Sequence, residues 1–226
     1  MDFGTAHVAD ALVRLGLPKR HAPYGTRAVQ DNQMLLVGRA APVRHYGSVD
    51  VFLEAIAHAE KGVVLVADNG GRMDESCIGD LIAAEAQFAG VAGIVIHGAH
   101  RDTAQLREIG LPIWSLGSHP FGPTELRSRP AVWERTAQLG AAIITHGDCI
   151  AADEDGVLVF AQEHKDEVLA EAHRLAETEA MQRRSLADGK PLRQQFHFNA
   201  FLERRSHDPR ASFRQHLAQV ERAIET

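Results

Sequence analysis

Short runs of β-type residues alternate with helical patterns up to Phe160, and this alternation constrains the fold more than any other feature. The runs are bounded by Gly, Pro, Asn or Asp and fall at residues 34–44, 62–67, 91–97, 112–116, 141–145 and 157–160. Helical patterns separate several of them, at residues 48–60, 79–89 and 103–109. Such an order of elements predicts a mixed α/β core around one hydrophobic interior.

The composition changes beyond Phe160. Residues 166–187 carry apolar side chains at helical spacing among many charges, and the pattern ends at Gly189-Lys190-Pro191. Residues 192–205 predict a further helix. Asp208-Pro209 is expected to supply the N-cap and the first residue of a last one. An isolated tail of this kind cannot bury its apolar stripe, so we expect it to pack on the core or on a neighbouring subunit.

These patterns divide the chain into an α/β domain at residues 1–160 and a helical extension at residues 161–226 that serves assembly or covers the site. Within the first domain, residues 5–16 predict a short amphipathic helix that ends at Gly16. Asp155-Gly156 is a favourable two-residue turn, which predicts a hairpin between the strands on either side of it.

The charge and the cysteines of the chain narrow its class. The formal net charge is −6 with both signs interspersed, so no basic stripe favours nucleic acid. No apolar run is long enough to span a membrane. Cys77 and Cys149 lie far apart without metal-binding spacing, and the chain opens without a signal-like segment. We therefore expect a cytoplasmic protein without a nucleic-acid or membrane partner.

The stretch from Asn69 to Asp102 contains the strongest functional pattern. A helix that starts at Gly79 rises about 16 Å, and the strand after Gly90 returns over a similar length. The end of that strand, with Arg101 and Asp102, should therefore lie beside the free N–H groups at the start of the helix. Such amides seat a carboxylate, Arg101 can hold it in a bidentate manner, and Asp102 offers hard oxygens to Mg²⁺ or Mn²⁺.

Simpler interpretations remain open at this point. Arg101-Asp102 also suits an ordinary helix entry with Asp102 as the N-cap. The thirteen histidines include no pair at helical i,i+4 spacing with a third ligand nearby, which argues against zinc. The acidic run at residues 153–155 is typical of a hairpin turn. Gly70-Gly71 predicts a tight turn or a place where substrate approaches the backbone.

Several of these segments together resemble the RraA-like family. The matching pieces are T-A-H-V-A-D-A-L, V-V-L-V-A-D-N-G-G, G-D-L-I, G-V-A-G-I-V-I-H-G-A-H-R-D, G-L-P-I-W and G-D-C-I-A-A-D-E-D-G-V, within residues 5–160. The family includes metal-dependent 4-hydroxy-4-methyl-2-oxoglutarate and 4-carboxy-4-hydroxy-2-oxoadipate aldolases and a regulator of ribonuclease activity. Its pattern pairs a glycine with an Arg-Asp about twenty residues later, and Gly79 with Arg101-Asp102 is similar to that pattern.

The resemblance implies a role for each matching residue. Asp102 would ligate a divalent metal, Mg²⁺ or Mn²⁺. Arg101, with the amides of Leu81 and Ile82 after Gly79, would hold the carboxylate of a pyruvyl unit. Asp80 would orient metal-bound water.

The resemblance also implies a glutamate from the C-terminal region of a neighbouring subunit, for which Glu177 and Glu179 are the candidates. The chain departs from the family pattern at Gln105, where an acidic residue is usual, and at His97, where aspartate is common. Both changes alter the charge around the site. Residues 119–139 also match poorly, and they bear on the part of the substrate beyond pyruvate.

The resemblance finally implies a fold, an assembly and an activity. The expected fold is the swivelling β/β/α domain, as a homotrimer or as a homohexamer formed by two trimers. The expected activity is cleavage of a 4-hydroxy-2-oxo acid to pyruvate and a second carbonyl compound, with oxaloacetate decarboxylation through the same enolate. The alternative is a non-catalytic protein that binds and regulates a ribonuclease. The family's regulator is shorter, and this chain continues beyond Phe160.

Overall fold

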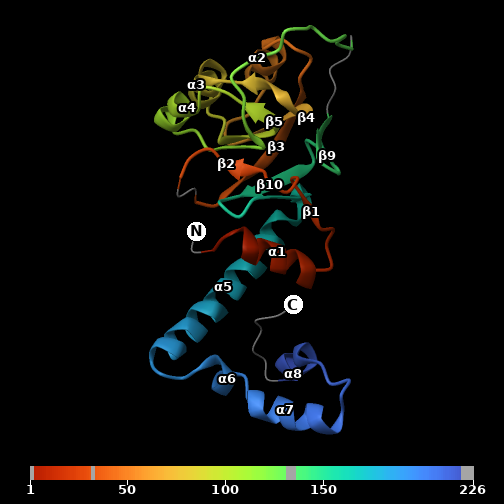
Figure 1. Cartoon of the computed structure of the whole chain (residues 1–226), viewed down its shortest axis with the longest axis vertical. Helices are drawn as coiled ribbons and strands as arrows, with labels where there is room; N and C mark the ends of the chain where they lie inside the picture. Colours follow the sequence, from red (N-terminus) through yellow and green to blue (C-terminus); the bar gives the residue numbers. More distant parts are fainter. Residues whose placement is uncertain (1–2, 32–33, 131–135, 220–226) are drawn as a thin grey trace. The chain divides into compact units, whose positions relative to one another are not determined.

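The computed structural model describes residues 3–31, 34–130 and 136–219. These residues form two compact units, which we describe separately (Figure 1). The first unit comprises Phe3–Ala6 and Pro18–Lys165, and the second comprises His7–Leu17 with residues 166–219. Across the described part of the chain, no helix combines the length and the apolar character that a membrane span requires.

A large mixed sheet organises the first unit. Its strand order is β1-β11-β10-β3-β4-β5-β6-β2, and β7 pairs with β5. The strands are β1 Arg20–His21, β2 Arg27–Ala28, β3 Leu36–Arg44, β4 Val64–Ile78, β5 Gly93–His100, β6 Ile113–Ser115, β7 Gly117–Ser118, β10 Asp148–Ala152 and β11 Val157–Ala161, with a separate hairpin of β8 Thr136–Leu139 and β9 Ala142–Thr145. Strands β3, β4, β5 and β6 run parallel, as helical crossovers between them require.

Helices cover one face of this sheet and strands cover the other. Helices α2 Asp50–Ala57, α3 Asp80–Ala89 and α4 Thr103–Ile109 lie on the same side of β4 and β5 (Figure 1). Their buried side chains form one hydrophobic cluster with β3, β4, β5 and β6. The opposite cluster joins β4 and β5 to β8, β9, β10 and β11, and Trp114 is fully buried in it. Successive β, β and α layers result, which confirms the predicted fold class.

Strand β4 is much longer than the run predicted at residues 62–67, because it continues as a bulged excursion that pairs with β5 at Arg72 and Ser76 on the way to Ile78. Asp68 pairs with His97 and Ile78 pairs with His100, so ten steps along β4 match three along β5. Gly70 and Gly71, with φ of 66° and 70°, make the left-handed turn of this excursion. The prediction of a tight turn there is confirmed. The returning segment brings the start of α3 beside the end of β5.

The hairpin of β10 and β11 is confirmed, but its turn lies one residue earlier than predicted. Asp153 N donates to Gly156 O at 3.0 Å, which centres the turn on Glu154 and Asp155. The side chain of Asp153 sets this position, because its Oδ1 accepts from Asp155 N at 3.0 Å. The same carboxylate also accepts hydrogen bonds from the backbone and hydroxyl of Thr5, both at 2.6 Å.

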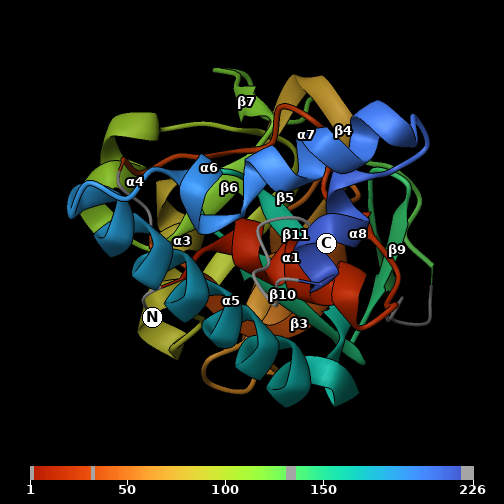
Figure 2. The same ribbon diagram turned by 90° about the horizontal axis from the view of Figure 1, so that it is seen from below.

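The second unit is helical. It contains most of α1 Thr5–Arg14 and α5 Lys165–Ala187, with α6 Leu192–Gln195, α7 Phe198–His207 and α8 Phe213–Gln219 (Figure 2). The two predicted helices at residues 5–16 and 166–187 are confirmed. The single helix predicted at residues 192–205 is wrong, because His197 adopts a left-handed conformation, with φ of 50°, and separates α6 from α7.

The N-cap predicted at Asp208 is also wrong. Ser212 Oγ accepts from Gln215 N at 3.2 Å, and Gln215 Oε1 accepts from Ser212 N at 3.4 Å. This reciprocal pair is a capping box, and it starts α8 four residues later than Asp208. Helices α7 and α8 pack through an aromatic cluster in which Phe213 contacts Phe201 with ring centroids 5.1 Å apart. The tail therefore buries part of its apolar surface within its own unit.

Candidate functional site

The predicted site residues meet where β4 and β5 end. Arg101 N donates to Ile78 O at 3.0 Å, one residue beyond the last paired position of the two strands. Helix α3 starts directly after Gly79, and α4 starts directly after Asp102. The carboxyl ends of adjacent parallel strands are where open α/β sheets bind ligands. We refer to Gly79, Asp80, Leu81, Ile82, Arg101 and Asp102 as the candidate site.

The carboxylate of Asp102 points at the start of α3. A Cβ added to Gly79 would lie 2.3 Å from Asp102 Oδ2, so only glycine leaves room for this approach. Asp80 N also lies 3.4 Å from Asp102 Oδ2. Asp102 occupies the N-cap position of α4, yet its side chain makes no capping hydrogen bond there. The helix-entry interpretation therefore accounts for the backbone of Asp102 and leaves its carboxylate facing another helix.

Asp102 also adopts an unusual backbone conformation. Its φ of 60° and ψ of 41° are left-handed, and the other described non-glycine residue with positive φ is His197. An L-residue in this region costs about 1 kcal/mol or more, and such strain is concentrated at functional sites. The strained turn directs the carboxylate toward Gly79 instead of along α4.

The guanidinium of Arg101 flanks the carboxylate. Arg101 Nε lies 3.4 Å from Asp102 Oδ2, and a methyl group at Gly122 would lie 3.1 Å from Arg101 Nη1. Half of the Arg101 side chain is exposed, as is a third of Asp102. Their charges remain accessible from solvent. Gly122 was not among the predicted residues, because it lies in the stretch 119–139 that matches the family poorly; residues 131–135 of that stretch fall outside the described residues.

The amides at the start of α3 are partly engaged. Leu81 N donates to Asp80 Oδ1 at 2.8 Å, so a ligand carboxylate would replace the Asp80 side chain at this amide. Leu81 is largely exposed, whereas Ile82 is buried in the hydrophobic cluster that the helices share with the sheet. The structure thus brings all six candidate-site residues together at one end of the sheet.

The donor chemistry of this site fits a hard divalent cation. Among the described residues, no three or more His, Cys, Asp or Glu side chains converge as a metal-binding group. A cation at Asp102 would therefore keep water in most of its coordination shell, as Mg²⁺ does in many protein sites. The carboxylate oxygens of Asp102 are ligands of the right type, and a third of this side chain is exposed to solvent.

The two departures from the family pattern lie in different surroundings. Gln105 is exposed on α4. His97 instead faces Asp68, with Nδ1 3.5 Å from Asp68 Oδ1, and its Nε2 accepts from Gly140 N at 3.3 Å. Burial alone would raise the pKa of Asp68, but hydrogen bonds from His97, Gln138 N and Gly70 N outweigh it and lower that pKa. His97 therefore belongs to a buried pair instead of the candidate site.

A second buried pair lies close to the first on β4. Arg127 Nη1 donates to Glu75 Oε1 at 2.8 Å, and Arg72 Nη2 lies 3.4 Å from Glu75 Oε2. His45 joins it through Asn69 Oδ1, which lies 2.9 Å from His45 Nδ1. We call the set of Asp68, His97, Glu75, Arg127, Asn69 and His45 the buried ion network. Burial lowers the pKa of His45, so this imidazole is neutral near pH 7.

The two candidate glutamates of α5 differ in their engagement. Glu179 Oε2 lies 3.3 Å from His7 Nε2 and 3.1 Å from Arg183 Nη1, all within the helical unit. Glu177 is two-thirds exposed and lies 3.7 Å from His173 Nδ1. Of the two carboxylates, that of Glu177 is the more accessible to another molecule.

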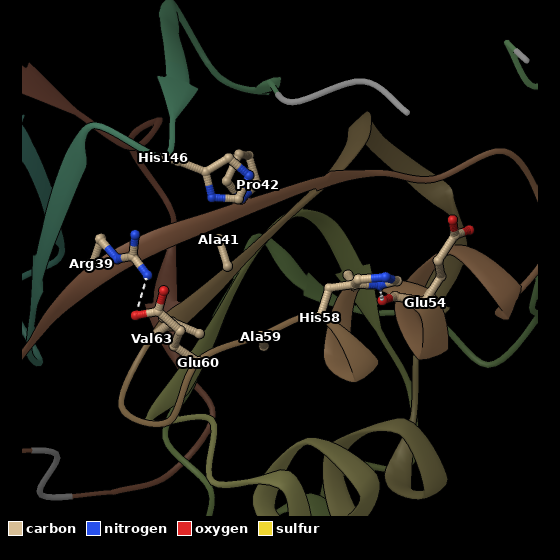
Figure 3. Close-up of a pocket in the computed structure, with 10 residues that line it drawn as sticks. Arg39, Ala41, Pro42, Glu54, His58, Ala59, Glu60, Val63 and His146 are labelled. Carbon is tan, nitrogen blue, oxygen red and sulfur yellow. Dashed lines mark hydrogen bonds and ion pairs between the residues drawn. The ribbon is translucent and has the colours of Figure 1, made fainter. Parts of the chain in front are cut away.

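A separate cavity of about 500 Å³ opens beside β3 and α2 (Figure 3). Its floor is apolar, with Ala41, Pro42 and Val63, and an ion pair of Arg39 Nη2 with Glu60 Oε2 at 2.6 Å closes one end. No residue of the candidate site lines it. The site at Asp102 is therefore defined by its chemistry and backbone geometry rather than by cavity size.

Fold and site together define an α/β protein with an accessible Arg-Asp pair where parallel strands end against a glycine-initiated helix. Residues 5–159 match the model of the RraA-like family, described as Aldolase/RraA. The chain belongs to the RraA-like family.

Individual relatives agree with this assignment. A protein of Alkalilimnicola ehrlichii named "Putative 4-hydroxy-4-methyl-2-oxoglutarate aldolase" is 35% identical over 124 residues, which cover 54% of this chain and 74% of that protein. An uncharacterized protein of Pseudomonas syringae pv. tomato has a similar structure, with a TM-score of 0.73, 26% identity, and coverage of 85% of this chain and 92% of that one. A Streptomyces coelicolor protein, described as an unusual member of the RNase ES inhibitor RraA family, gives a TM-score of 0.68 at 27% identity, covering 80% of this chain and 91% of that one.

Proposed function

We propose that this protein is a divalent-metal-dependent lyase that cleaves a 4-hydroxy-2-oxo acid to pyruvate and a second carbonyl compound, with oxaloacetate decarboxylation as a side activity. The observation that carries the proposal is the orientation of Asp102. Its carboxylate leaves its own helix uncapped and faces the glycine-initiated start of α3, with Arg101 alongside. The name of the Alkalilimnicola ehrlichii relative supports the substrate class.

In this proposal each charged side chain has a separate task. Arg101 binds the carboxylate of the 2-oxo acid, together with the backbone amides of Leu81 and Ile82. Mg²⁺ or Mn²⁺ held by Asp102 would supply positive charge that stabilises the oxygen of the 2-oxo group. Asp80 orients the water that accepts the proton of the C4 hydroxyl group. The C3–C4 bond then breaks, its electron pair forms the enolate of pyruvate, and a proton returns to C3.

The direct test is pyruvate release from 4-hydroxy-4-methyl-2-oxoglutarate and from oxaloacetate, with Mg²⁺, with Mn²⁺ and with chelator. We expect release to require the metal. Asp102→Asn should lower the rate by about 1,000-fold or more, because it removes the charge that holds the cation while keeping the side-chain shape. Circular dichroism of the variant controls for folding. Equal rates with chelator, or in a folded Asp102→Asn variant, would contradict the proposal.

Binding to a ribonuclease is a second candidate function, favoured by the likeness to the Streptomyces coelicolor family member. Both functions agree with a homotrimer or homohexamer, which we also propose. The same assay separates them. The regulatory function would be favoured if neither substrate were turned over, with or without metal, and if calorimetry showed tight binding to a ribonuclease.

A further inference from the structure

A buried histidine lies directly before Arg101 and links three elements around the candidate site. The ring of His100 at the end of β5 is buried, and Nδ1 lies 2.7 Å from Ser115 Oγ at the end of β6. On the other side of the ring, Nε2 lies 3.0 Å from Thr103 Oγ1, in the first residue of α4. Both ring nitrogens therefore have hydroxyl partners.

One consistent assignment of donors and acceptors satisfies all the hydrogen bonds around this ring. Gly117 N donates to Ser115 Oγ at 3.2 Å, and Ser115 Oγ donates to Gly117 O at 3.3 Å. Nδ1–H of His100 then donates to Ser115 Oγ, and Nε2 accepts from the hydroxyl of Thr103. This assignment uses a neutral imidazole, with one nitrogen as the donor and the other as the acceptor. Chains of this kind fix the orientation of every member.

The link between His100 and Thr103 spans the strained turn. Arg101 and Asp102 are the two residues between them, and Asp102 is the one held in the left-handed conformation. The turn is also fixed from outside, because His119 N donates to His100 O at 2.8 Å. A hydrogen bond between the side chains at the two ends of the turn opposes its relaxation to an ordinary helix entry.

We propose that His100, acting through Thr103 and Ser115, is a positioning residue that holds Asp102 and Arg101 in the orientation that binds metal and substrate. This rests on the proposed function of the same site. The pattern H-R-D-T places the two linked side chains three residues apart around the Arg-Asp pair, and sequence analysis did not single it out. Groups that orient a metal ligand commonly change metal affinity by about 10- to 100-fold when removed.

The test removes the hydroxyl group of Thr103 and keeps the shape of its side chain. Thr103→Val removes the hydrogen bond to His100, Thr103→Ser keeps it, and Thr145→Val is a matched control on β9, where Thr145 Oγ1 donates to Asp148 Oδ2 at 3.1 Å. Hydrogen–deuterium exchange of the metal-free protein measures how firmly the turn is held. Mn²⁺ titration by electron paramagnetic resonance measures metal affinity, and separate effects on KM and kcat distinguish substrate binding from turnover.

We expect peptides covering residues 101–106 to exchange roughly fivefold faster in Thr103→Val, as the loss of one hydrogen bond implies, with no change in the other two variants. The dissociation constant for Mn²⁺ should rise about tenfold in Thr103→Val and return toward the wild-type value in Thr103→Ser. KM should change more than kcat if the turn mainly positions Arg101 for binding.

Three outcomes would contradict different parts of this account. Unchanged exchange at residues 101–106 in Thr103→Val would overturn the positioning role, whatever the wild type binds. A wild-type protein that binds no Mn²⁺ and releases no pyruvate would instead overturn the proposed function, and the exchange result would still decide whether His100 holds the turn. Faster exchange with an unchanged Mn²⁺ affinity would confine His100 to a structural role and also overturn the proposal.

Discussion

The candidate site and the buried ion network both use charged residues in β4 and β5 or directly after them, but the charges are paired in the network and left accessible at the site. In the network, Glu75 is buried and both of its oxygens face arginines, while both oxygens of Asp68 accept backbone hydrogen bonds. At the candidate site, Asp102 and Arg101 are partly exposed, and they lie 3.4 Å apart with little else to engage them.

The comparison shows how two neighbouring strands inside the sheet serve two purposes. Buried charges must be paired, since an unpaired one costs several kcal/mol, so the network holds the excursion of β4 in place. The excursion in turn returns Gly79 to the end of β5. Charges that remain accessible retain binding capacity for a ligand. We therefore expect changes in the network to affect stability first and changes at the candidate site to affect activity first.

After Asp102→Asn, the largest effect is expected at Arg101. Arg101→Lys keeps the charge but loses the planar fork that holds a carboxylate, so pyruvate release should fall by about 100-fold. The melting temperature should remain close to that of the wild type, because the side chain is half exposed. Steady-state kinetics and thermal melting measure the two quantities. A large drop in melting temperature would place Arg101 with the network and erase the distinction.

The reverse result is expected at Glu75. Glu75→Gln removes the buried charge that Arg72 and the two-thirds-buried Arg127 face, and should lower the free energy of unfolding by about 2 kcal/mol. Urea unfolding followed by circular dichroism measures this change. Activity per folded molecule should stay within a few-fold of the wild type. A stable variant without activity would show that the network takes part in catalysis.

Acid should weaken the network through Asp68. The pKa of this carboxyl is lowered in the folded protein, so its contribution to stability is present above the unfolded pKa, about 3.9. The contribution is lost as the pH falls through the folded pKa. Asp68→Asn should therefore lower the free energy of unfolding more at pH 7 than below pH 3, as measured by urea unfolding under both conditions. The exposed Asp188→Asn is the control, and a pH-independent difference for Asp68→Asn would oppose this account.

The smallest effect is expected in the helical unit. Glu177→Gln should lower turnover by a few-fold if its accessible carboxylate joins a neighbouring site, as outer groups tune metal-bound water. Glu179→Gln should mainly affect stability, because Glu179 already contacts His7 and Arg183. Steady-state kinetics of both variants show which of the two glutamates contributes to turnover. Equal turnover in both and in the wild type would remove the C-terminal glutamate from the proposal.

Much of this arrangement could be predicted from sequence because it depends on local periodicity. Strands β3, β5 and β6, helices α3 and α4, and the meeting of Gly79 with Asp102 all follow from the lengths of consecutive elements. The excursion of β4 could not be predicted, because pairing with β5 at both ends decides where it returns. The break at His197 and the capping box at Ser212 also depended on local hydrogen bonds that propensity does not specify.

The candidate site shows the same limit. Residue types identified Asp102 and Arg101, but not the left-handed backbone that turns the carboxylate away from α4. His97 could not be assigned either, because only the fold reveals that it faces Asp68. Side-chain direction at a strand end is set by tertiary contacts, and a single sequence does not contain them.

The most direct test of the central claim is anomalous X-ray diffraction from crystals soaked with Mn²⁺ and pyruvate. We predict a manganese peak beside the carboxylate of Asp102, with the pyruvate carboxylate between Arg101 and the amides of Leu81 and Ile82. Density for neither ligand at that position, or a peak at the buried ion network, would contradict the account.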